Sequence, residues 1–300
     1  MPRLYPMTVV MATLGGDTLS GTIEQLNRGT IYPAEILVCI PEKEALRAAH
    51  LSFTNVKVIV TACRGQVAQR AIGFQKAAHD IVMQLDDDIR VDEHCIARLL
   101  QTLQTHSPLV AVAPALREDG AGDMTRMKNP LFLKMFYFLC NGREGFRMGG
   151  VSRAGHNFGY DRSPVKEGVH DVEWFPGGCV IHFRQNLITE NFFPFEGKAY
   201  GEDVLHCYYL AKNGIRLKVD LDAHCYLENA STASYGIREF IRMISGHYRS
   251  KKYYVKLSSR SLIRMNLFYA ALVLNYFIKK LNCLSASVKL NVLLRSGHVT

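Results

Sequence analysis

A chain of 300 residues, 48% of them hydrophobic, is long enough to bury the core of one large domain or of a domain with an appendage. This composition excludes a disordered or fibrous protein. The eight cysteines form no C-x-x-C pair and lie mostly in apolar stretches, which favours reduced, packed thiols over a disulfide framework. The sequence therefore predicts a cytoplasmic protein.

Neither a signal peptide nor a membrane-spanning helix is expected. Residues 1–10 contain one arginine and two prolines and lack the apolar stretch that a signal peptide requires. The apolar segment 267–278 contains Asn275 and ends at two lysines. It is about a dozen residues long, whereas a spanning helix needs roughly 20.

The charge is concentrated at the C-terminal end. Residues 1–235 contain 24 Lys and Arg against 26 Asp and Glu, whereas residues 236–300 contain 12 against 1. A basic, aromatic-rich segment with an apolar stripe favours attachment to an anionic membrane surface, here the inner face of the cell membrane. A solvated helical appendage and a nucleic-acid contact are the alternatives for such a charge run. We expect the membrane surface and not nucleic acid as the partner.

Short apolar runs and helical segments alternate in the first half of the chain. Strands are predicted over 8–13, 35–40, 56–60, 81–85 and 109–113, and helices over 17–29, 66–78 and 92–105. This order predicts an α/β fold with a single, mostly parallel sheet flanked by helices. Because ligands bind beyond the carboxyl ends of such strands, the loops after the first four strands should share a site.

The second half is less regular. Between residues 114 and 170 only the apolar stretch 131–140 stands out, and long irregular segments of this kind are often functional. A strand region at 172–183, a helix at 202–213 and a strand at 215–219 follow. The helical segments 237–255 and 261–281 come last. We predict a main domain over 1–235 and a basic helical appendage over 236–300.

Three adjacent acids, Asp86, Asp87 and Asp88, come directly after the buried strand 81–85. Their mutual repulsion would raise their pKa values unless a cation offsets it. Mg²⁺ prefers one or two carboxylates together with phosphate oxygens, and alternation along the chain can aim Asp86 and Asp88 to the same side. A helix cap or a solvated acidic turn is the alternative.

This order of elements, with Gly65-Gln66-Val67-Ala68-Gln69-Arg70-Ala71-Ile72-Gly73 before Leu85-Asp86-Asp87-Asp88 and a later Gly201-Glu202-Asp203, resembles glycosyltransferase family 2. The resemblance runs from about Met7 to Glu228. It implies a GT-A fold, a nucleoside-diphosphate-sugar donor, and Mg²⁺ or Mn²⁺ as the cofactor.

The resemblance also implies roles for individual residues on the donor side. Thr13 and its loop would contact the nucleotide, and Arg70 would lie beside the base or the diphosphate. Asp86, with Asp87, would face the ribose or the donor sugar, and Asp88 would bind the metal. The family usually has an aspartate just past the second strand, where this chain has Glu42. We expect Glu42 to take its place at the nucleobase.

The second acidic motif, Glu202 and Asp203, follows Gly201 at the start of a predicted helix, where the helix dipole favours ionised acids. N-terminal capping is the alternative explanation. The resemblance makes Asp203 the general base, with Glu202 on the acceptor side. A single carboxylate base without a protein nucleophile predicts inversion at the anomeric carbon.

Two further sites come from the resemblance. His224, at the end of a predicted strand, would be an additional ligand of the metal or the diphosphate; a structural histidine is the alternative. The segment containing Trp174, Gly177 and Gly178 resembles the acceptor-side loop of the family. There, the glycines would let a sugar approach the backbone and the indole would cover its apolar face, although Trp174 could equally be a core anchor.

These patterns predict an inverting, metal-dependent glycosyltransferase that acts on a glycan or a lipid-linked acceptor. A nucleotidyltransferase for sugar phosphates is a second hypothesis. It usually has a basic, glycine-rich phosphate loop near the N-terminus, and Thr13-Leu14-Gly15-Gly16-Asp17 lacks the basic residue. A non-enzymatic nucleotide-sugar-binding membrane adaptor is the third, and it would not need Asp203.

Overall fold

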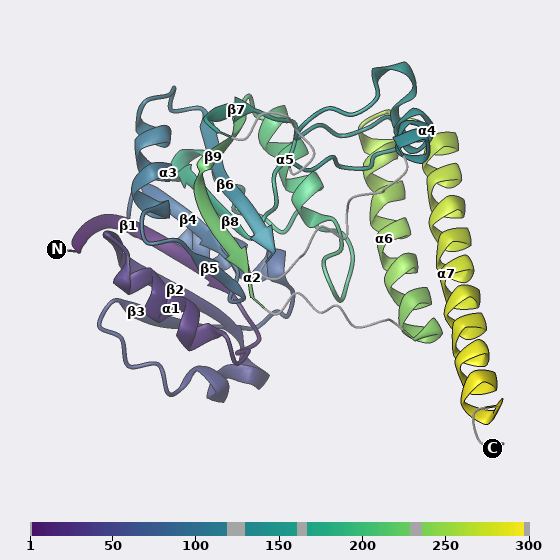
Figure 1. Cartoon of the computed structure of the whole chain (residues 1–300). Coiled ribbons are helices and arrows are strands. Elements are labelled where there is room, and N and C mark those ends of the chain that lie inside the picture. The colour runs from purple at the N-terminus through teal and green to yellow at the C-terminus, as the bar shows by residue number, and fades with distance from the viewer. Residues whose placement is uncertain (1, 119–129, 161–166, 229–235, 297–300) are drawn as a thin grey trace.

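The computed structural model describes residues 2–118, 130–160, 167–228 and 236–296. One nine-stranded sheet runs through it, in the order β3-β2-β1-β4-β8-β6-β9-β5, with β7 paired to β9 (Figure 1). Helices cover both faces of the sheet, and two long helices stand at one side. The predicted α/β class is confirmed.

The first four strands are parallel. They are β1 (Arg3–Ala12), β2 (Ile31–Pro41), β3 (Val56–Thr61) and β4 (Ile81–Leu85). Side chains alternate between the two faces of each strand, so Val9 and Met11 enter one core cluster while Val10 enters another. All three are fully buried, which explains why the sequence of β1 is continuously apolar.

The remaining strands make the sheet mixed. β8 (Cys179–Phe183) lies antiparallel between β4 and β6 (Val110–Glu118). β6 pairs in parallel with β9 (Arg216–Leu227), which also pairs antiparallel with β5 (Ile89–Val91) and β7 (Val169–Asp171). The predicted parallel arrangement therefore holds for β3-β2-β1-β4 and for β6-β9. Because β8 reverses between these two groups, β4, β6 and β9 all end at the same edge of the sheet.

Two sets of helices cover the faces. α1 (Leu19–Arg28) and α3 (Cys95–Gln104) pack on one face through Leu19, Ile23 and Leu99. α2 (Gln66–Lys76) and α5 (Glu202–Lys212) lie on the other face. Three short 3₁₀ helices, η1 (Glu42–Ala48), η2 (Gly142–Glu144) and η3 (Arg184–Asn186), connect other elements.

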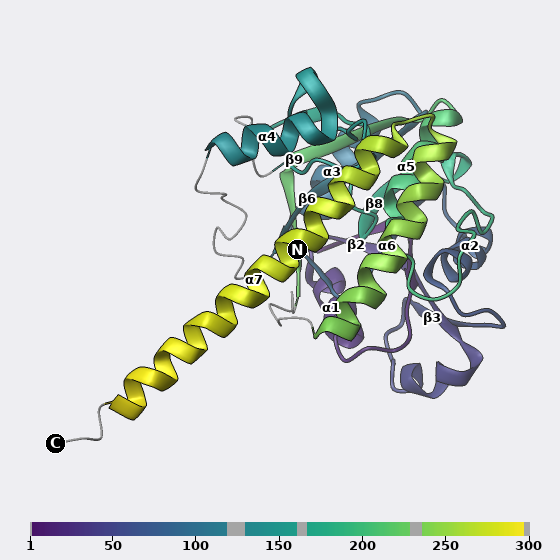
Figure 2. The same cartoon turned by 90° about the vertical axis from the view of Figure 1, so that its right-hand side faces the viewer.

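The C-terminal helices share a core with the sheet domain. α6 (Ile237–Leu257) and α7 (Leu262–Ser296) run side by side, with α4 (Pro130–Asn141) against α7 (Figures 1 and 2). Tyr254, Met265 and Phe268 belong to the same buried cluster as Trp174 and Leu205. α7 extends beyond the predicted end at residue 281. No helix within the described ranges is long and apolar enough to cross a membrane.

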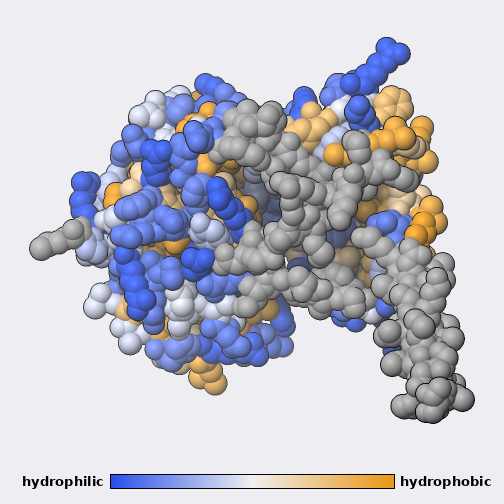
Figure 3. Space-filling view, viewed as in Figure 1, coloured by the Kyte–Doolittle hydropathy of each residue, from blue (hydrophilic) through white to orange (hydrophobic). Residues whose placement is uncertain are grey.

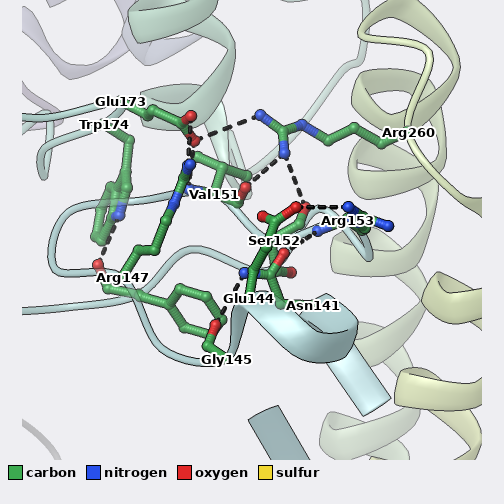
Figure 4. A network of polar contacts seen from close by, with 11 residues as sticks. Asn141, Glu144, Gly145, Arg147, Val151, Ser152, Arg153, Glu173, Trp174 and Arg260 are labelled. Carbon is green, nitrogen blue, oxygen red and sulfur yellow. Dashed lines mark hydrogen bonds and ion pairs between the residues drawn. The ribbon is translucent and has the colours of Figure 1, made fainter. Parts of the chain in front are cut away.

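A polar network fastens the segment before β8 to the turn between α6 and α7 (Figure 4). Arg260 donates to the carbonyl oxygens of Val151 and Ser152, at 2.5 and 3.0 Å, and lies 3.5 Å from the Glu173 carboxylate. Glu173 in turn accepts from the backbone N–H of Val151 at 2.8 Å and pairs with Arg147. The C-terminal helices are thus joined to the segment that leads into the sheet edge.

Candidate active site

The first acidic cluster follows β4 at the edge where β1, β2 and β3 also end. The Asp86 N–H donates to the Gly178 carbonyl at 2.8 Å, which holds the acidic turn against the start of β8. Asp86, Asp87 and Asp88 are all partly exposed, whereas Leu85 and Ile89 on either side are buried. The buried flanks keep the three carboxylates at the surface of this edge.

The Thr13 loop is tied to the same turn. The Thr13 hydroxyl donates to the Asp87 carboxylate and accepts the Gly15 N–H at 2.8 Å. Gln69 donates to the carbonyls of Thr13 and Cys39, at 2.9 and 2.7 Å. The structure therefore brings the predicted donor-binding residues Thr13 and Asp87 together, and it uses their side chains to shape the loop.

Arg70 joins the two acidic motifs. Its guanidinium donates to Asp86 at 2.6 Å and to Glu202 at 2.8 Å, and its side chain is only 4% exposed. Although burial opposes the charge, Glu202 and Asp86 raise the pKa of Arg70. The terminal nitrogens of Arg70 thus bind the two acids that flank the site, and its predicted place beside the base or diphosphate stays a prediction.

Two glycines let the second motif approach the first. A Cβ on Gly177 would lie 3.0 Å from Glu202 Oε1 and 3.5 Å from the Asp203 Cβ. A Cβ on Gly178 would lie 3.3 Å from Asp86 Oδ2. Because both positions lack side chains, the segment before β8 fits between the acids, and Asp203 lies on the same side of the molecule as the Asp86 turn.

Asp203 combines burial with like charge. Burial, and then the adjacent Glu202, raise the pKa of Asp203 to about 6, while the positive charge of Lys251 and the Val204 N–H act in the opposite direction. A carboxylate with a pKa near 6 is ionised at neutral pH and is still a useful proton acceptor. Glu202 is 6% exposed and bound to Arg70, and its acceptor-side role stays a prediction.

Asp88 is the acid that fits a cation. Asp86 and Asp87 are engaged by Arg70 and Thr13, but no side chain in the described part of the chain hydrogen-bonds the Asp88 carboxylate. Burial, and then the charges of Asp86 and Asp87, raise the pKa of Asp88 to about 6, with Lys198 opposing. No three His, Cys, Asp or Glu side chains of the described residues converge as a preformed metal site. The donor set suits a hard cation that takes its other ligands from phosphate and water.

Backbone hydrogen bonds give the place of His224 relative to Asp88. The Asp92 N–H donates to the His224 carbonyl at 3.1 Å, and the Glu228 N–H donates to the Asp88 carbonyl at 2.9 Å. Three residues lie between His224 and Glu228, so the backbones of these two residues are about 13 Å apart at roughly 3.3 Å per residue. The role of His224 as a ligand of the metal or the diphosphate stays a prediction, and the residue whose backbone meets Asp88 is Glu228.

Trp174 is a core anchor. Its indole is 6% exposed, donates to the Phe158 carbonyl at 2.8 Å and stacks against Tyr160. These contacts favour the core-anchor alternative, and an acceptor-side role for Trp174 stays a prediction. At the other end of the site, Glu42 is exposed at the start of η1, and its contact with a nucleobase stays a prediction.

Sequence reasoning missed several polar residues that the fold brings to this edge. Gln66 donates to Asp86 at 2.9 Å. Glu44 is paired with Arg64 at 3.3 Å, and its second carboxylate oxygen is buried without a partner in the described ranges. Lys198 and Lys251 place charge near Asp88 and Asp203. Of these residues, only Gln66 belongs to a motif that the sequence analysis used. The others could not be found from a local sequence pattern, because they come to the site from distant segments of the chain.

Both the sequence and the fold have counterparts among known proteins. The sequence model of Glycosyl transferase family 2 matches residues 8–169, more than half of the chain. No curated protein shows significant similarity. The crystal structure of GalNAc-T7 with UDP, GalNAc and Mn²⁺ superposes with a TM-score of 0.53 at 17% identity, covering 82% of this chain and 49% of that one.

A second similar structure is the mannosyltransferase PcManGT from Pyrobaculum calidifontis in complex with GDP-Man and Mn²⁺. Its TM-score is 0.50 at 14% identity, covering 95% of this chain and 81% of that one. The chain thus spans about half of the length of the GalNAc-T7 chain and most of the PcManGT chain. At these identities the likeness establishes the fold, and the predicted GT-A fold is confirmed.

Proposed function

Because the chain belongs to glycosyltransferase family 2, we propose that it transfers a sugar from a nucleoside-diphosphate-sugar donor to a hydroxyl of a glycan or lipid-linked acceptor, with inversion. One observation carries this proposal. Arg70 bridges Asp86 and Glu202, so the donor-side acids and the neighbouring Asp203 border one site.

In this reaction Asp203 is the general base. Its carboxylate takes the proton of the acceptor hydroxyl, and the hydroxyl oxygen forms a bond to the anomeric carbon. The bond from that carbon to the diphosphate oxygen breaks, and the nucleoside diphosphate leaves on the opposite face. The pKa of Asp203, near 6, supports this role because most of the side chain is ionised at neutral pH.

The donor side is proposed to lie between the Thr13 loop and Asp88. Asp88 would hold Mg²⁺ or Mn²⁺, since its carboxylate is the one that Arg70 and Thr13 leave available. Such an ion supplies positive charge to the leaving diphosphate. Lys198, whose charge interacts with Asp88, would contact the same diphosphate.

The test is hydrolysis of a panel of nucleotide sugars with Mn²⁺ or Mg²⁺. Metal-dependent release of a nucleoside diphosphate is expected, with little release in the Asp88→Asn variant. Formation of pyrophosphate from a sugar phosphate and a nucleoside triphosphate would instead identify a nucleotidyltransferase. Donor binding without any turnover, and with equal affinity in Asp203→Asn, would identify an adaptor.

We also propose that the enzyme works at an anionic membrane surface on the cytoplasmic side, using α4 and α7. Met135 and Phe138 on α4 are 60% and 59% exposed, and Ile263 and Leu267 form an exposed stripe on α7. Arg264 holds the two helices together by donating to the Phe138 and Leu139 carbonyls. Figure 3 shows apolar side chains gathered on this side of the molecule. Exposed apolar residues beside basic ones suit a lipid–water interface.

Flotation with vesicles of neutral lipid and about one third anionic lipid tests this surface. The triple variant Met135→Ser, Phe138→Ser, Leu267→Ser should bind at least about tenfold more weakly than the natural chain. The control is Leu46→Ser, since Leu46 is 90% exposed on η1, in the N-terminal part of the sheet domain. Equal binding by the triple variant and the control would exclude this surface.

A further inference from the structure

Helix α6 packs directly on the turn that presents Asp203. A Cβ on Gly246 would lie 2.5 Å from the Tyr200 ring, so only glycine allows this approach. One residue later, the ring of His247 lies 4.4 Å from that of Tyr200. One turn further along, Ser250 is buried with its hydroxyl oxygen 3.7 Å from a Cβ built on Gly201. One face of α6 therefore covers the residues just before the proposed base.

Lys251 follows Ser250 on this face. Its side chain passes the Gly155 turn, where a Cβ would lie 3.1 Å from the Lys251 Cδ and 2.6 Å from Val255. Gly155 has a φ of +76°, a conformation that favours glycine, so the turn admits the lysine stem without a side chain in its way. The ammonium makes no hydrogen bond or ion pair with any residue for which the structure gives a position; its one ring contact is Tyr254, 5.9 Å away.

We propose that Lys251 is a positioning residue for the transfer reaction: from the C-terminal helix, its ammonium keeps the Asp203 carboxylate ionised and ready to accept the acceptor's proton. This inference rests on the proposed function of Asp203. It makes α6, which lies outside residues 8–169 of the family match, a part of the active site.

The charges around the pair favour this role. Burial lowers the pKa of Lys251 to about 8, while Asp203 raises it and Arg260 lowers it further. The two imidazoles that face Lys251 are neutral, because burial and then Lys251 lower the pKa of His156 and of His247 to about 4. Arg260 is engaged by Glu173 and backbone carbonyls. Lys251 is therefore the cation that acts on Asp203.

The groups that face Asp203 on its other sides do not supply positive charge. Glu202 is adjacent and negative, and its partner is Arg70. Tyr160 and Cys207 are neutral, since burial raises the pKa of both well above the ordinary value. Without Lys251, burial and Glu202 would act on Asp203 unopposed, and its pKa would rise from about 6 towards neutrality.

The test compares Lys251→Met, which keeps an unbranched stem without charge, with Lys251→Arg, which keeps the charge. The first readout is the titration of the Asp203 carboxyl by ¹³C NMR in the metal-free chain, assigned with Asp203→Asn. The pKa of Asp203 should rise by about one unit in Lys251→Met and stay near the natural value in Lys251→Arg. Lys252→Met is the matched control, because Lys252 is the adjacent residue and is exposed.

The second readout is the pH profile of kcat/KM. Because only the ionised carboxylate accepts a proton, activity is present above the pKa of Asp203 and is lost as the pH falls through about 6. In Lys251→Met the acidic limb should move up by about one unit, which is roughly a fivefold loss at pH 6 and only about twofold at pH 7. A uniform loss at every pH would indicate a merely structural role.

An unchanged Asp203 titration in folded Lys251→Met overturns the inference. Should that variant not fold, Lys251→Gln carries the same expectation. Failure of the proposed function looks different: Asp203→Asn would then transfer sugar at the natural rate, while the NMR titration would still report whether Lys251 acts on Asp203.

Discussion

The two acidic motifs border one site but are held in different ways. The Asp86 turn is held by neighbours that belong to the parallel strands and α2: Thr13, Gln66 and Arg70 bind its carboxylates directly. Asp203 has no such ring of side-chain donors in the described ranges. Its surroundings are the Gly177 backbone, Glu202 and helix α6 from the end of the chain. The donor side is thus a local structure, and the base side depends on long-range packing.

This difference suggests a division of labour. A rigid, hydrogen-bonded turn suits a cation and a diphosphate, whose geometry is the same for every acceptor. A base that is set by burial and by a helix from another part of the chain depends on the segments that surround the acceptor. Arg70, which binds one acid from each motif, is the point where the two halves meet.

The largest effect is expected at the base. Asp203→Asn should lower kcat by about 10²- to 10⁴-fold, because the amide cannot take the hydroxyl proton, and should leave donor affinity unchanged. Steady-state transfer and calorimetric donor binding with Mn²⁺ check this separation. Asp171→Asn is the control, since Asp171 is exposed and pairs with Arg216. Loss of donor affinity in Asp203→Asn would show that the base side and the donor side of the site do not act separately.

Removing the link should cost stability. Arg70→Met leaves Glu202 buried without its partner and Asp86 without its ion pair, so the free energy of unfolding should fall by about 3–5 kcal/mol. Arg64→Met is the matched control. Arg64 pairs with Glu44, but its side chain is 66% exposed, so the free energy of unfolding should fall by less than about 1 kcal/mol. Urea unfolding measures both variants. Similar losses would show that the buried ion pairs of Arg70 contribute no more to stability than an exposed pair.

On the donor side, Asp88→Asn should weaken metal-dependent donor binding by about 100-fold, the loss of one charged ligand. The same change removes a carboxylate that burial and two like charges disfavour, since they raise the pKa of Asp88 to about 6. The metal-free variant should therefore be more stable at pH 7, by about 1 kcal/mol after allowance for partial exposure. Calorimetry and urea unfolding test the two effects. A lower free energy of unfolding together with unchanged donor affinity would contradict the assignment of Asp88 as the metal ligand.

The smallest effect is expected at His224. Because β9 carries it four residues from the position opposite Asp88, His224→Ala should change donor affinity by less than about threefold. A His224→Ala variant that binds the donor as weakly as Asp88→Asn would instead place His224 at the metal, as the resemblance implies.

The same contrast explains how much could be predicted from the sequence. Alternating apolar runs located β1 to β4, and a strand end rich in acids located the Asp86 turn, because both are local patterns. Trp174, Arg70 and His224 were assigned by resemblance, and their contacts depend on burial, on an ion pair between distant segments and on strand register. Lys251 lies 48 residues after Asp203, and no local pattern connects them.

The most direct test of the account is the anomeric configuration of the product, followed by ¹H NMR from the first turnovers with the donor that the hydrolysis panel identifies. With the base and the leaving diphosphate on opposite faces of one sugar carbon, the account predicts that the configuration of the donor is inverted. A product that keeps the donor's configuration would contradict a direct displacement assisted by Asp203.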